Sequence, residues 1–313
     1  MKEVLITGSE GFVGHHLWRE LENAGYDVYG TVLNPSPNLN PKVFPCDVTN
    51  LVATEKLISE LRPDAIIHLA GWSNQGSSFA NPQKTFEINV IGTINLLESV
   101  RKIEGYRPKI VAIGSAAEFG EVSLEKLLIN EETLFNPTSP YGVSKVASWL
   151  SCKQYVSSYG MDIVYAIPFN HTGPGQATGF LAPDIASQIV AIERGDKEAI
   201  ILTGNLSPKR DILDVRDVVR AYRLLLEKGI AGERYIISTG KSIQVKAIVD
   251  KLLSFSKVEI ALKRDESRIR PTEISDSYGD HQKITAATGW QPEIPLDQTL
   301  QDLLNYYREK GKI

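Results

Sequence analysis

Short apolar runs alternate with segments of helical periodicity over the first half of the chain. Residues 4–7 form an apolar run that ends at Gly8, and residues 15–24 then repeat apolar positions at helical spacing. The same order recurs, with strands expected at 26–31, 43–46, 64–71, 109–114 and 162–167, and helices at 51–61, 83–103 and 141–159. Continuous apolar runs are typical of parallel strands that are buried on both faces. The pattern therefore predicts an α/β fold, a Rossmann-type doubly wound parallel sheet.

The regular alternation stops after Pro168. Residues 169–175 are expected to form a loop, residues 234–238 to return as a strand to the main sheet, and a last helix to begin near Leu296. We therefore expect two lobes: a dinucleotide-binding lobe of residues 1–168 and about 211–239, and a smaller mixed α/β substrate lobe of about 169–210 and 240–313. A ligand cleft is expected between them, over the carboxyl ends of the strands.

Composition narrows the class of protein. The 313 residues are 42% hydrophobic and 23% charged, with a net charge of −4, which is typical of a globular protein with a sizeable core. No basic run supports nucleic-acid binding, and no uncharged apolar run is long enough to span a membrane. Two cysteines form no disulfide framework, and neither has a spaced histidine or cysteine that would indicate a metal site. Without a recognisable signal peptide, a reducing cytoplasmic setting is expected.

A glycine-rich turn follows the first expected strand. Gly8, Gly11 and Gly14 are spaced as Gly-x-x-Gly-x-x-Gly, which differs from the Gly-x-Gly-x-x-Gly of most dinucleotide folds. Glycine is needed where the backbone approaches a pyrophosphate, and the helix that follows supplies N–H donors at its amino end. A tight turn without a ligand would have the same composition. The position between the first strand and the first helix favours the dinucleotide site.

The end of the second expected strand bears on the choice between NAD and NADP. An acidic residue there would bond the ribose hydroxyl of NAD, and a nearby arginine would bind the phosphate of NADP. Residues 30–34 contain neither. The absence of an acidic residue slightly favours NADP(H) as the cofactor, and NAD(H) remains an alternative.

Tyr141 and Lys145 lie four residues apart, so on a helix they share one face. A phenol has an unperturbed pKa of about 10, and a neighbouring cation would lower that pKa and make the phenol a usable acid or base. The spacing alone is weak, because Tyr306 and Lys310 repeat it near the end of an amphipathic helix. Only the surrounding motifs can show which of the two Tyr-Lys pairs belongs to an active site.

Four features occur in one order: the motif Thr7-Gly8-x-x-Gly11-Phe12-x-Gly14, Ser115 after the fifth strand, Tyr141-x-x-x-Lys145, and a variable carboxyl lobe. As a set they resemble the extended short-chain dehydrogenase/reductase family of nucleotide-sugar enzymes. Further matches point within that family to GDP-mannose 4,6-dehydratases and their relatives: Phe169-Asn170-His171, Gly204-Asn205-Leu206, Arg210-Asp211 and Arg270-Pro271-Thr272-Glu273.

The resemblance implies a role for each matching residue. Tyr141 would be the acid/base, Lys145 would lower its pKa and hold the nicotinamide ribose, and Ser115 would bond the C4 oxygen of the sugar. The cofactor would be held by Gly8, Gly11, Phe12, Val13, Gly14, Thr31, Asp47, Val48, Leu69, Ala70, Gly71, Ser73 and Pro168, together with Tyr141 and Lys145.

The substrate would be held by Ser115, Asn170, Asn205, Arg210, Arg270 and Glu273. Planar guanidinium groups suit the oxygens of a diphosphate. The alternative for each arginine is a surface salt bridge, and Asp211 is a ready partner for Arg210. The alternative for Glu273 is a capping or solvated position.

One departure from the dehydratase pattern decides between reactions. Dehydration needs an added acid/base carboxylate, which that pattern places two residues after the catalytic hydroxyl. The matching residue here is Ala117, and Glu118 is one position away, which in an extended segment would point it to the opposite face.

The resemblance then implies reduction at C4, of GDP-4-keto-6-deoxy-D-mannose to a GDP-6-deoxyhexose, with GDP-D-rhamnose the favoured product. Three alternatives stay open: a nucleotide-sugar 4-epimerase with tightly bound NAD, a GDP-mannose 4,6-dehydratase, which Ala117 disfavours, and a catalytically silent dinucleotide-sensing scaffold. The family also implies a homodimer formed through helices at 85–100 and 141–159.

Overall fold

The computed structural model describes residues 2–35, 40–123, 127–266 and 274–310. Arg270 and Glu273, two of the predicted substrate residues, lie outside the described residues. Among the helices of the described residues, none is long and apolar enough to cross a membrane.

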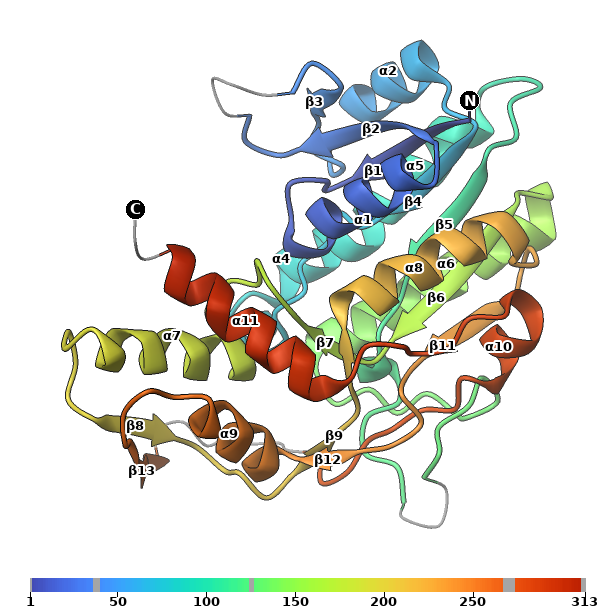
Figure 1. The fold of residues 1–313 in the computed structure, drawn as a ribbon. Helices are drawn as coiled ribbons and strands as arrows, with labels where there is room; N and C mark the ends of the chain where they lie inside the picture. The colour runs from blue at the N-terminus through green and yellow to red at the C-terminus, as the bar shows by residue number, and fades with distance from the viewer. Residues whose placement is uncertain (1, 36–39, 124–126, 267–273, 311–313) are drawn as a thin grey trace.

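Seven parallel strands form one sheet in the order β11-β6-β5-β4-β1-β2-β3 (Figure 1). They are β1 Glu3–Thr7, β2 Asp27–Val32, β3 Val43–Pro45, β4 Ala65–His68, β5 Lys109–Ile113, β6 Ile163–Pro168 and β11 Arg234–Ile237. Every neighbouring pair is parallel, and the strand order runs outward from β1 in both directions. Such a reversal opens a crevice at the carboxyl ends of the strands. The predicted doubly wound fold is confirmed.

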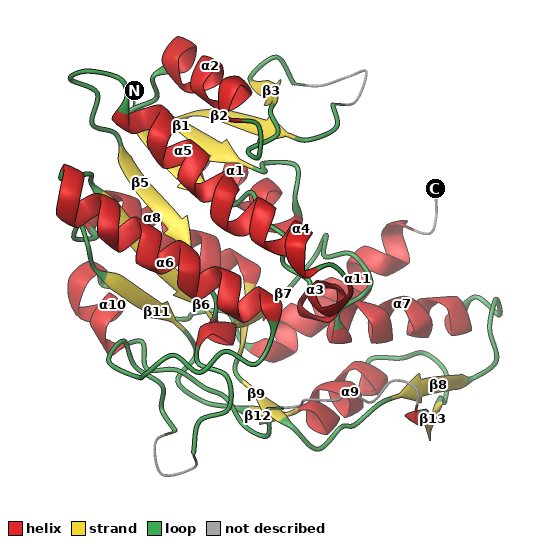
Figure 2. Ribbon diagram, turned by 180° about the vertical axis from the view of Figure 1, so that it is seen from behind, coloured by secondary structure: helices red, strands yellow, loops and turns green. Residues whose placement is uncertain are grey.

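Helices cover both faces of this sheet. Helices α1 Phe12–Asn23 and α8 Val215–Lys228 pack together on one face, whereas α2 Leu51–Leu61, α5 Gly92–Arg101 and α6 Pro140–Tyr159 cover the other (Figures 1 and 2). The start of α6 is set by Pro140 in its first turn and by the Ser139 side chain, which accepts a hydrogen bond from the Gly142 N–H. Helix α6 ends at Gly160, whose φ of 63° is left-handed.

The helix expected at 83–103 is interrupted. It consists of α4 Pro82–Phe86, a π-helical turn η1 Glu87–Ile91, and α5, and a short helix α3 Gln75–Ala80 precedes it. Asn89 lies in the π turn, where its Oδ1 accepts from the Trp72 N–H at 2.7 Å and its Nδ2 donates to Ser144 Oγ at 2.9 Å. The extra residue of a π turn re-aims side chains, and such turns are frequent at functional sites.

A second hydrophobic core lies beside the sheet. It is built from α7 Leu181–Glu193, α9 Val245–Ser254, α11 Leu296–Lys310 and the strand β8 Ile200–Thr203, which pairs with β13 Ala261–Arg264. Two small sheets connect the cores: β7 Asn170–Thr172 pairs in parallel with β10 Ile212–Asp214, and β9 Lys209–Arg210 pairs with β12 Ile243–Gln244. Helix α10 Gln282–Thr288 packs with the first core through Ile284.

The segment 169–175, expected to be a loop, therefore contains a strand. Strand β7 is three residues long, and its pairing partner β10 lies about forty residues further along the chain. A strand that depends on so distant a partner leaves no periodic signal in its own sequence.

Candidate active site

A cleft of about 1110 Å³ opens over the carboxyl ends of β1, β4, β5 and β6. Its walls come from the sheet on one side and from α7, β8 and β9 on the other. The structure brings these predicted residues to its lining: Gly8, Gly11, Phe12, Val13, Gly14, Thr31, Leu69, Ala70, Gly71, Ser73, Ser115, Tyr141, Lys145, Pro168, Asn170, Asn205 and Arg210.

Asp47 and Val48 do not line this cleft. Asp47 is exposed and its Oδ1 accepts from the Thr49 N–H at 2.9 Å. Val48 is buried under α5, where its carbonyl accepts from Asn95 Nδ2 at 2.9 Å. Their predicted contact with an adenine stays a prediction.

The glycine turn is shaped by close backbone approaches. Gly8 has a φ of +73°, and a Cβ there would lie 3.1 Å from the backbone of Ala70. Gly14 lies in the first turn of α1, where a Cβ would lie 2.4 Å from the carbonyl oxygen of Ser9. In the described residues no side chain caps the amino end of α1, so its N–H groups face the turn and suit an anion.

Threonine and histidine side chains fasten this turn to the neighbouring strand end. Thr7 Oγ1 accepts from the Ala70 N–H at 3.1 Å and lies 2.8 Å from Nδ1 of His68. The other ring nitrogen of His68 lies 3.2 Å from Thr93 Oγ1, and burial lowers the pKa of His68 to about 3. His68 is thus a neutral core histidine.

Tyr141, Ser115 and Lys145 meet on the floor of the cleft. Tyr141 lies in the first turn of α6, and its hydroxyl lies near the side chain of Ser115, which stands two residues after the end of β5 at Ile113. The Lys145 Nζ donates to the carbonyl of Ile113 at 2.9 Å and lies 5.9 Å from the centre of the Tyr141 ring. The second Tyr-Lys pair, Tyr306 and Lys310, lies on α11, away from this floor.

Burial sets the proton affinities of this group. It raises the pKa of Tyr141 to about 12, against the hydrogen bond from Ser115, which lowers it. It also lowers the pKa of Lys145 to about 8. The sequence predicts that Lys145 lowers the pKa of Tyr141. Burial raises that pKa instead, and the group that lowers it is Ser115. At neutral pH Tyr141 carries its proton, which is the form that a proton donor needs.

The segment after Ser115 places no carboxylate in the cleft. Residues 116–118 form a 3₁₀ turn, η2 Ala116–Glu118, and not the extended segment considered for Glu118. Ala117 lines the cleft, whereas Glu118 is fully buried behind the floor. The carboxylates among the described lining residues are Glu10, in the glycine turn, and Asp184, in α7.

Asn170 and Arg210 stand on the opposite wall. Asn170 Nδ2 donates to the carbonyl of Asp211 at 3.4 Å. Arg210 Nη1 donates to the carbonyls of Lys209 and Ile274, each at 2.7 Å. Asp211, considered as a salt-bridge partner for Arg210, is instead buried and accepts from the N–H groups of Thr239 and Gly240.

The cleft also has lining residues that were not predicted. Trp72 and Gln75 follow β4, with Trp72 Nε1 donating to Ser77 Oγ at 2.7 Å and Gln75 Nε2 donating to Ser139 Oγ at 3.2 Å. His171 stacks on Phe12 with ring centres 6.3 Å apart. The place of Trp72 and Gln75 beside Ser73, at a strand end, was a usable signal for them.

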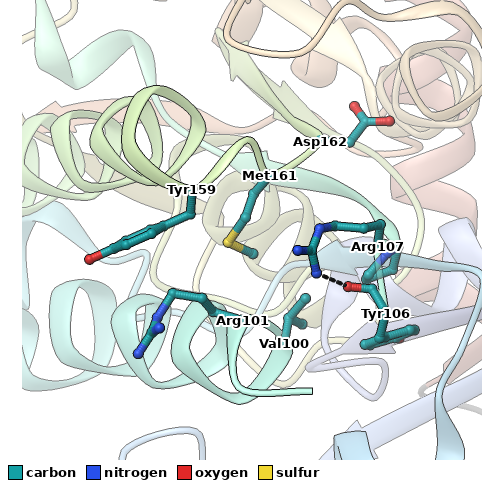
Figure 3. A pocket seen from close by; sticks show the side chains of 8 residues that line it. Val100, Arg101, Tyr106, Arg107, Tyr159, Met161 and Asp162 are labelled. Carbon is teal, nitrogen blue, oxygen red and sulfur yellow. Dashed lines mark hydrogen bonds between the residues drawn. The ribbon is translucent and has the colours of Figure 1, made fainter. Parts of the chain in front are cut away.

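A smaller hollow of about 210 Å³ lies at the opposite end of β5 and β6 (Figure 3). Its Arg101 is held by both carboxylate oxygens of Glu98 at 2.7 Å and stacks over Tyr159, and its Arg107 donates to the Tyr106 carbonyl. None of the predicted site residues that the structure describes lines this hollow.

A glycine turn and a Ser-Tyr-Lys group at the carboxyl edge of one parallel sheet define the class: an enzyme of the extended short-chain dehydrogenase/reductase type. The sequence model of the family GDP-mannose 4,6 dehydratase matches residues 5–303, and the chain belongs to this family. The resemblance drawn from the motifs is thereby confirmed.

Individual relatives match over more than nine tenths of their length. The chain is 34% identical to GDP-6-deoxy-D-mannose reductase of Pseudomonas aeruginosa, covering 99% of this chain and 98% of that protein. It is 28% identical to GDP-mannose 4,6-dehydratase of Yersinia enterocolitica, covering 97% and 93%.

Solved structures agree with these matches. The structure of RMD from Pseudomonas aeruginosa complexed with NADPH has a TM-score of 0.89 at 33% identity, covering 99% of this chain and 100% of that one. UDP-glucose 4-epimerase of Thermotoga maritima has a TM-score of 0.86 at 26% identity, covering 99% of each chain.

Proposed function

We propose that this protein reduces the C4 keto group of GDP-4-keto-6-deoxy-D-mannose with NADPH or NADH, forming GDP-D-rhamnose. One observation carries the proposal: Ser115 and Tyr141 line the cleft together, and Ala117 stands where the dehydratase pattern has its acid/base carboxylate. The relative named GDP-6-deoxy-D-mannose reductase supports the substrate class.

The residues of the glycine turn fit a dinucleotide. Without side chains, Gly8 and Gly14 let the turn pack closely against the backbone of Ala70 and Ser9, and the amino end of α1 presents N–H groups to the turn. We propose NADP(H) over NAD(H), because residues 31–35 at the end of β2 include no acid to bond a ribose hydroxyl. The related structure with NADPH supports this choice.

The residues on the cleft floor suit a single proton transfer. When bound, the reduced nicotinamide supplies the hydride that C4 receives. The Tyr141 phenol, oriented by Ser115, donates a proton to the C4 oxygen as that oxygen becomes an alkoxide. Lys145, fixed by the Ile113 carbonyl one helical turn from Tyr141, keeps a cation at the floor.

The wall opposite the floor is proposed to bind the nucleotide sugar. Asn170, Asn205 and Arg210 line it, and a guanidinium beside a diphosphate forms two parallel charge-assisted bonds. The division into a dinucleotide lobe and a substrate lobe is part of this proposal, as are the roles of Arg270 and Glu273.

The proposal is tested by incubating the protein with GDP-4-keto-6-deoxy-D-mannose and either NADPH or NADH, then identifying the product sugar. We expect Tyr141→Phe to reduce kcat by about 10²–10⁴-fold, because the phenol proton is lost while the ring still packs. Binding of the nucleotide sugar should be largely kept in that variant. Substantial turnover by Tyr141→Phe would overturn the assignment of Tyr141 as the proton donor.

A nucleotide-sugar 4-epimerase is the second candidate, favoured by the likeness to UDP-glucose 4-epimerase. An epimerase keeps its cofactor through the cycle, whereas a reductase must exchange it at each turnover. NAD that stays bound through purification would therefore favour the epimerase. A dehydratase is disfavoured by Ala117, and a silent scaffold by the presence of Ser115, Tyr141 and Lys145.

We also propose a homodimer formed through α4, η1, α5 and α6. Apolar side chains are exposed along these helices, at Phe86, Ile91, Val143 and Leu150. A cytoplasmic location is proposed as well, supported by Cys46 and Cys152, which are both buried and unpaired.

A further inference from the structure

Glu118 is a fully buried carboxyl group in the segment that carries Ser115. Its Oε1 accepts from the Ser115 N–H at 2.8 Å, and Ser115 Oγ accepts from the Ala117 N–H at 3.2 Å. The two bonds form a reciprocal capping box at the start of η2. Glu118 thus holds the backbone from which the Ser115 side chain reaches the cleft.

A tyrosine connects the same carboxyl group to α6. The Tyr165 hydroxyl lies 3.1 Å from Glu118 Oε1 and 2.8 Å from the carbonyl oxygen of Lys145. A phenol has one hydrogen, so it cannot be donated fully to both acceptors. A charged Glu118 draws this hydrogen, whereas a neutral Glu118 leaves it to the Lys145 carbonyl.

The packing is shaped around this carboxyl group. A Cβ at Gly114 would lie 2.4 Å from Glu118 Oε1 and 2.3 Å from the Tyr165 ring, so only glycine leaves room for the pair. Among the described residues, Glu118 Oε2 and the Arg234 Nη1 are both buried without a hydrogen-bond partner. Burying a carboxylate that lacks a hydrogen-bond partner lowers the stability of the fold. The presence of Glu118 here therefore points to a role other than stabilising the fold.

Several charged or titratable groups face Glu118 from the elements packed against it. They are Tyr141, Lys145 and Cys152 of α6, Tyr165 of β6 and Arg234 of β11.

We propose that Glu118 is a positioning residue for the proposed reduction. Glu118 holds the backbone of Ser115, connects to Lys145 through Tyr165, and determines the charge beneath Ser115 and Lys145. The proposal rests on the proposed function for its turnover measurements, but its binding measurement does not.

This proposal predicts that the charge of Glu118 affects the pH at which Lys145 loses its proton. Burial raises the pKa of Glu118 to about 7, so its charge changes near neutral pH. The charged carboxylate raises the pKa of Lys145, opposing the burial that lowers it to about 8. Removing that charge must move the deprotonation of Lys145 to lower pH.

The test is Glu118→Gln, which keeps the shape and an acceptor oxygen. NADPH affinity and kcat/KM for the keto sugar are measured in the full chain from about pH 6 to about pH 9. We expect both to fall with rising pH at a midpoint roughly one pH unit lower in Glu118→Gln than in the unaltered protein. Tyr165→Phe should move the midpoint in the same direction by less, because Glu118 without the phenol hydrogen bond is less often charged.

Glu131→Gln is the matched control. Glu131 is also buried and accepts from the Ile236 N–H at 2.8 Å, but it lies outside the cleft floor. We expect its midpoints to equal those of the unaltered protein, whatever its effect on stability.

Equal midpoints in Glu118→Gln and the unaltered protein, with both folded, overturn the proposal. If Glu118→Gln does not fold, unchanged midpoints in Tyr165→Phe overturn it. If the unaltered protein turns over no keto sugar, the proposed function fails, and the NADPH binding profiles still decide the role of Glu118.

Discussion

Gly14 shows how one missing side chain determines the shape of the cofactor site. It lies in the first turn of α1 with the Ser9 carbonyl where a Cβ would be. We expect Gly14→Ala to push the glycine turn away from α1, weaken NADPH binding by at least about tenfold and lower Tm. Fluorescence titration and thermal unfolding measure the two effects. His15→Ala, at the exposed neighbouring position, should leave both nearly unchanged.

At the residue scale, the sequence predicted where the site residues lie but not how tightly their side chains bind protons. Gly8, Ser115 and Tyr141 could be placed at one sheet edge, because strands that run in parallel end at the same side. The pKa of Tyr141 could not be predicted, since desolvation depends on everything packed around it. The position of Glu118 was considered only for an extended segment, and the 3₁₀ turn reveals its bond to the Ser115 backbone.

At the scale of elements, Asp211 joins β9 and β10 to two distant segments. Its buried carboxylate accepts from the N–H and hydroxyl of Thr239 and from the N–H groups of Gly240 and Gly279. Asp211→Ala leaves these buried donors unpaired, so we expect the free energy of unfolding to fall by about 2–4 kcal/mol. Urea unfolding measures the change. Asp250→Ala, which removes an exposed pair with Lys246, should stay within about 0.5 kcal/mol of the unaltered protein.

Asp211 also makes the stability of the fold depend on pH. Burial raises the pKa of Asp211 to about 6, above its unfolded value of about 4. A raised folded-state pKa means that the folded protein binds the proton more tightly than the unfolded chain does. The stability that this proton contributes is therefore lost as the pH rises from the unfolded-state pKa to the folded-state pKa. The cost of Asp211→Ala should therefore be larger near pH 4.5 than near pH 7. An equal cost at both would contradict the raised pKa.

Elements that form from local periodicity were predictable, and elements that need distant partners were not. Helix α2 was expected at its observed bounds because its apolar positions repeat at helical spacing. The π turn η1 breaks a helix whose sequence pattern is continuous, and its Asn89 bonds Trp72 and Ser144, which lie far from it in the sequence or on another helix. Strand β7 exists only through β10.

At the scale of the whole molecule, the helical face of α4, η1, α5 and α6 is the proposed dimer surface (Figure 2). Leu150 on α6 is 53% exposed there. We expect Leu150→Glu to shift the protein from dimer to monomer, because a carboxylate buried in an apolar interface is strongly unfavourable. Sedimentation velocity measures the change. Val52→Glu on α2, where Val52 is 74% exposed, should leave the mass unaltered.

The second core has a consequence for the order in which a nascent chain can acquire its structure. That core combines buried residues of α7, α9 and α11, and α11 is synthesised last. All seven strands of the main sheet have left the ribosome before α11 does. Vectorial synthesis therefore allows the sheet and its glycine turn to form first, while the far wall of the cleft waits for α11 to dock. A nascent chain therefore completes the glycine turn before it completes the far wall of the cleft.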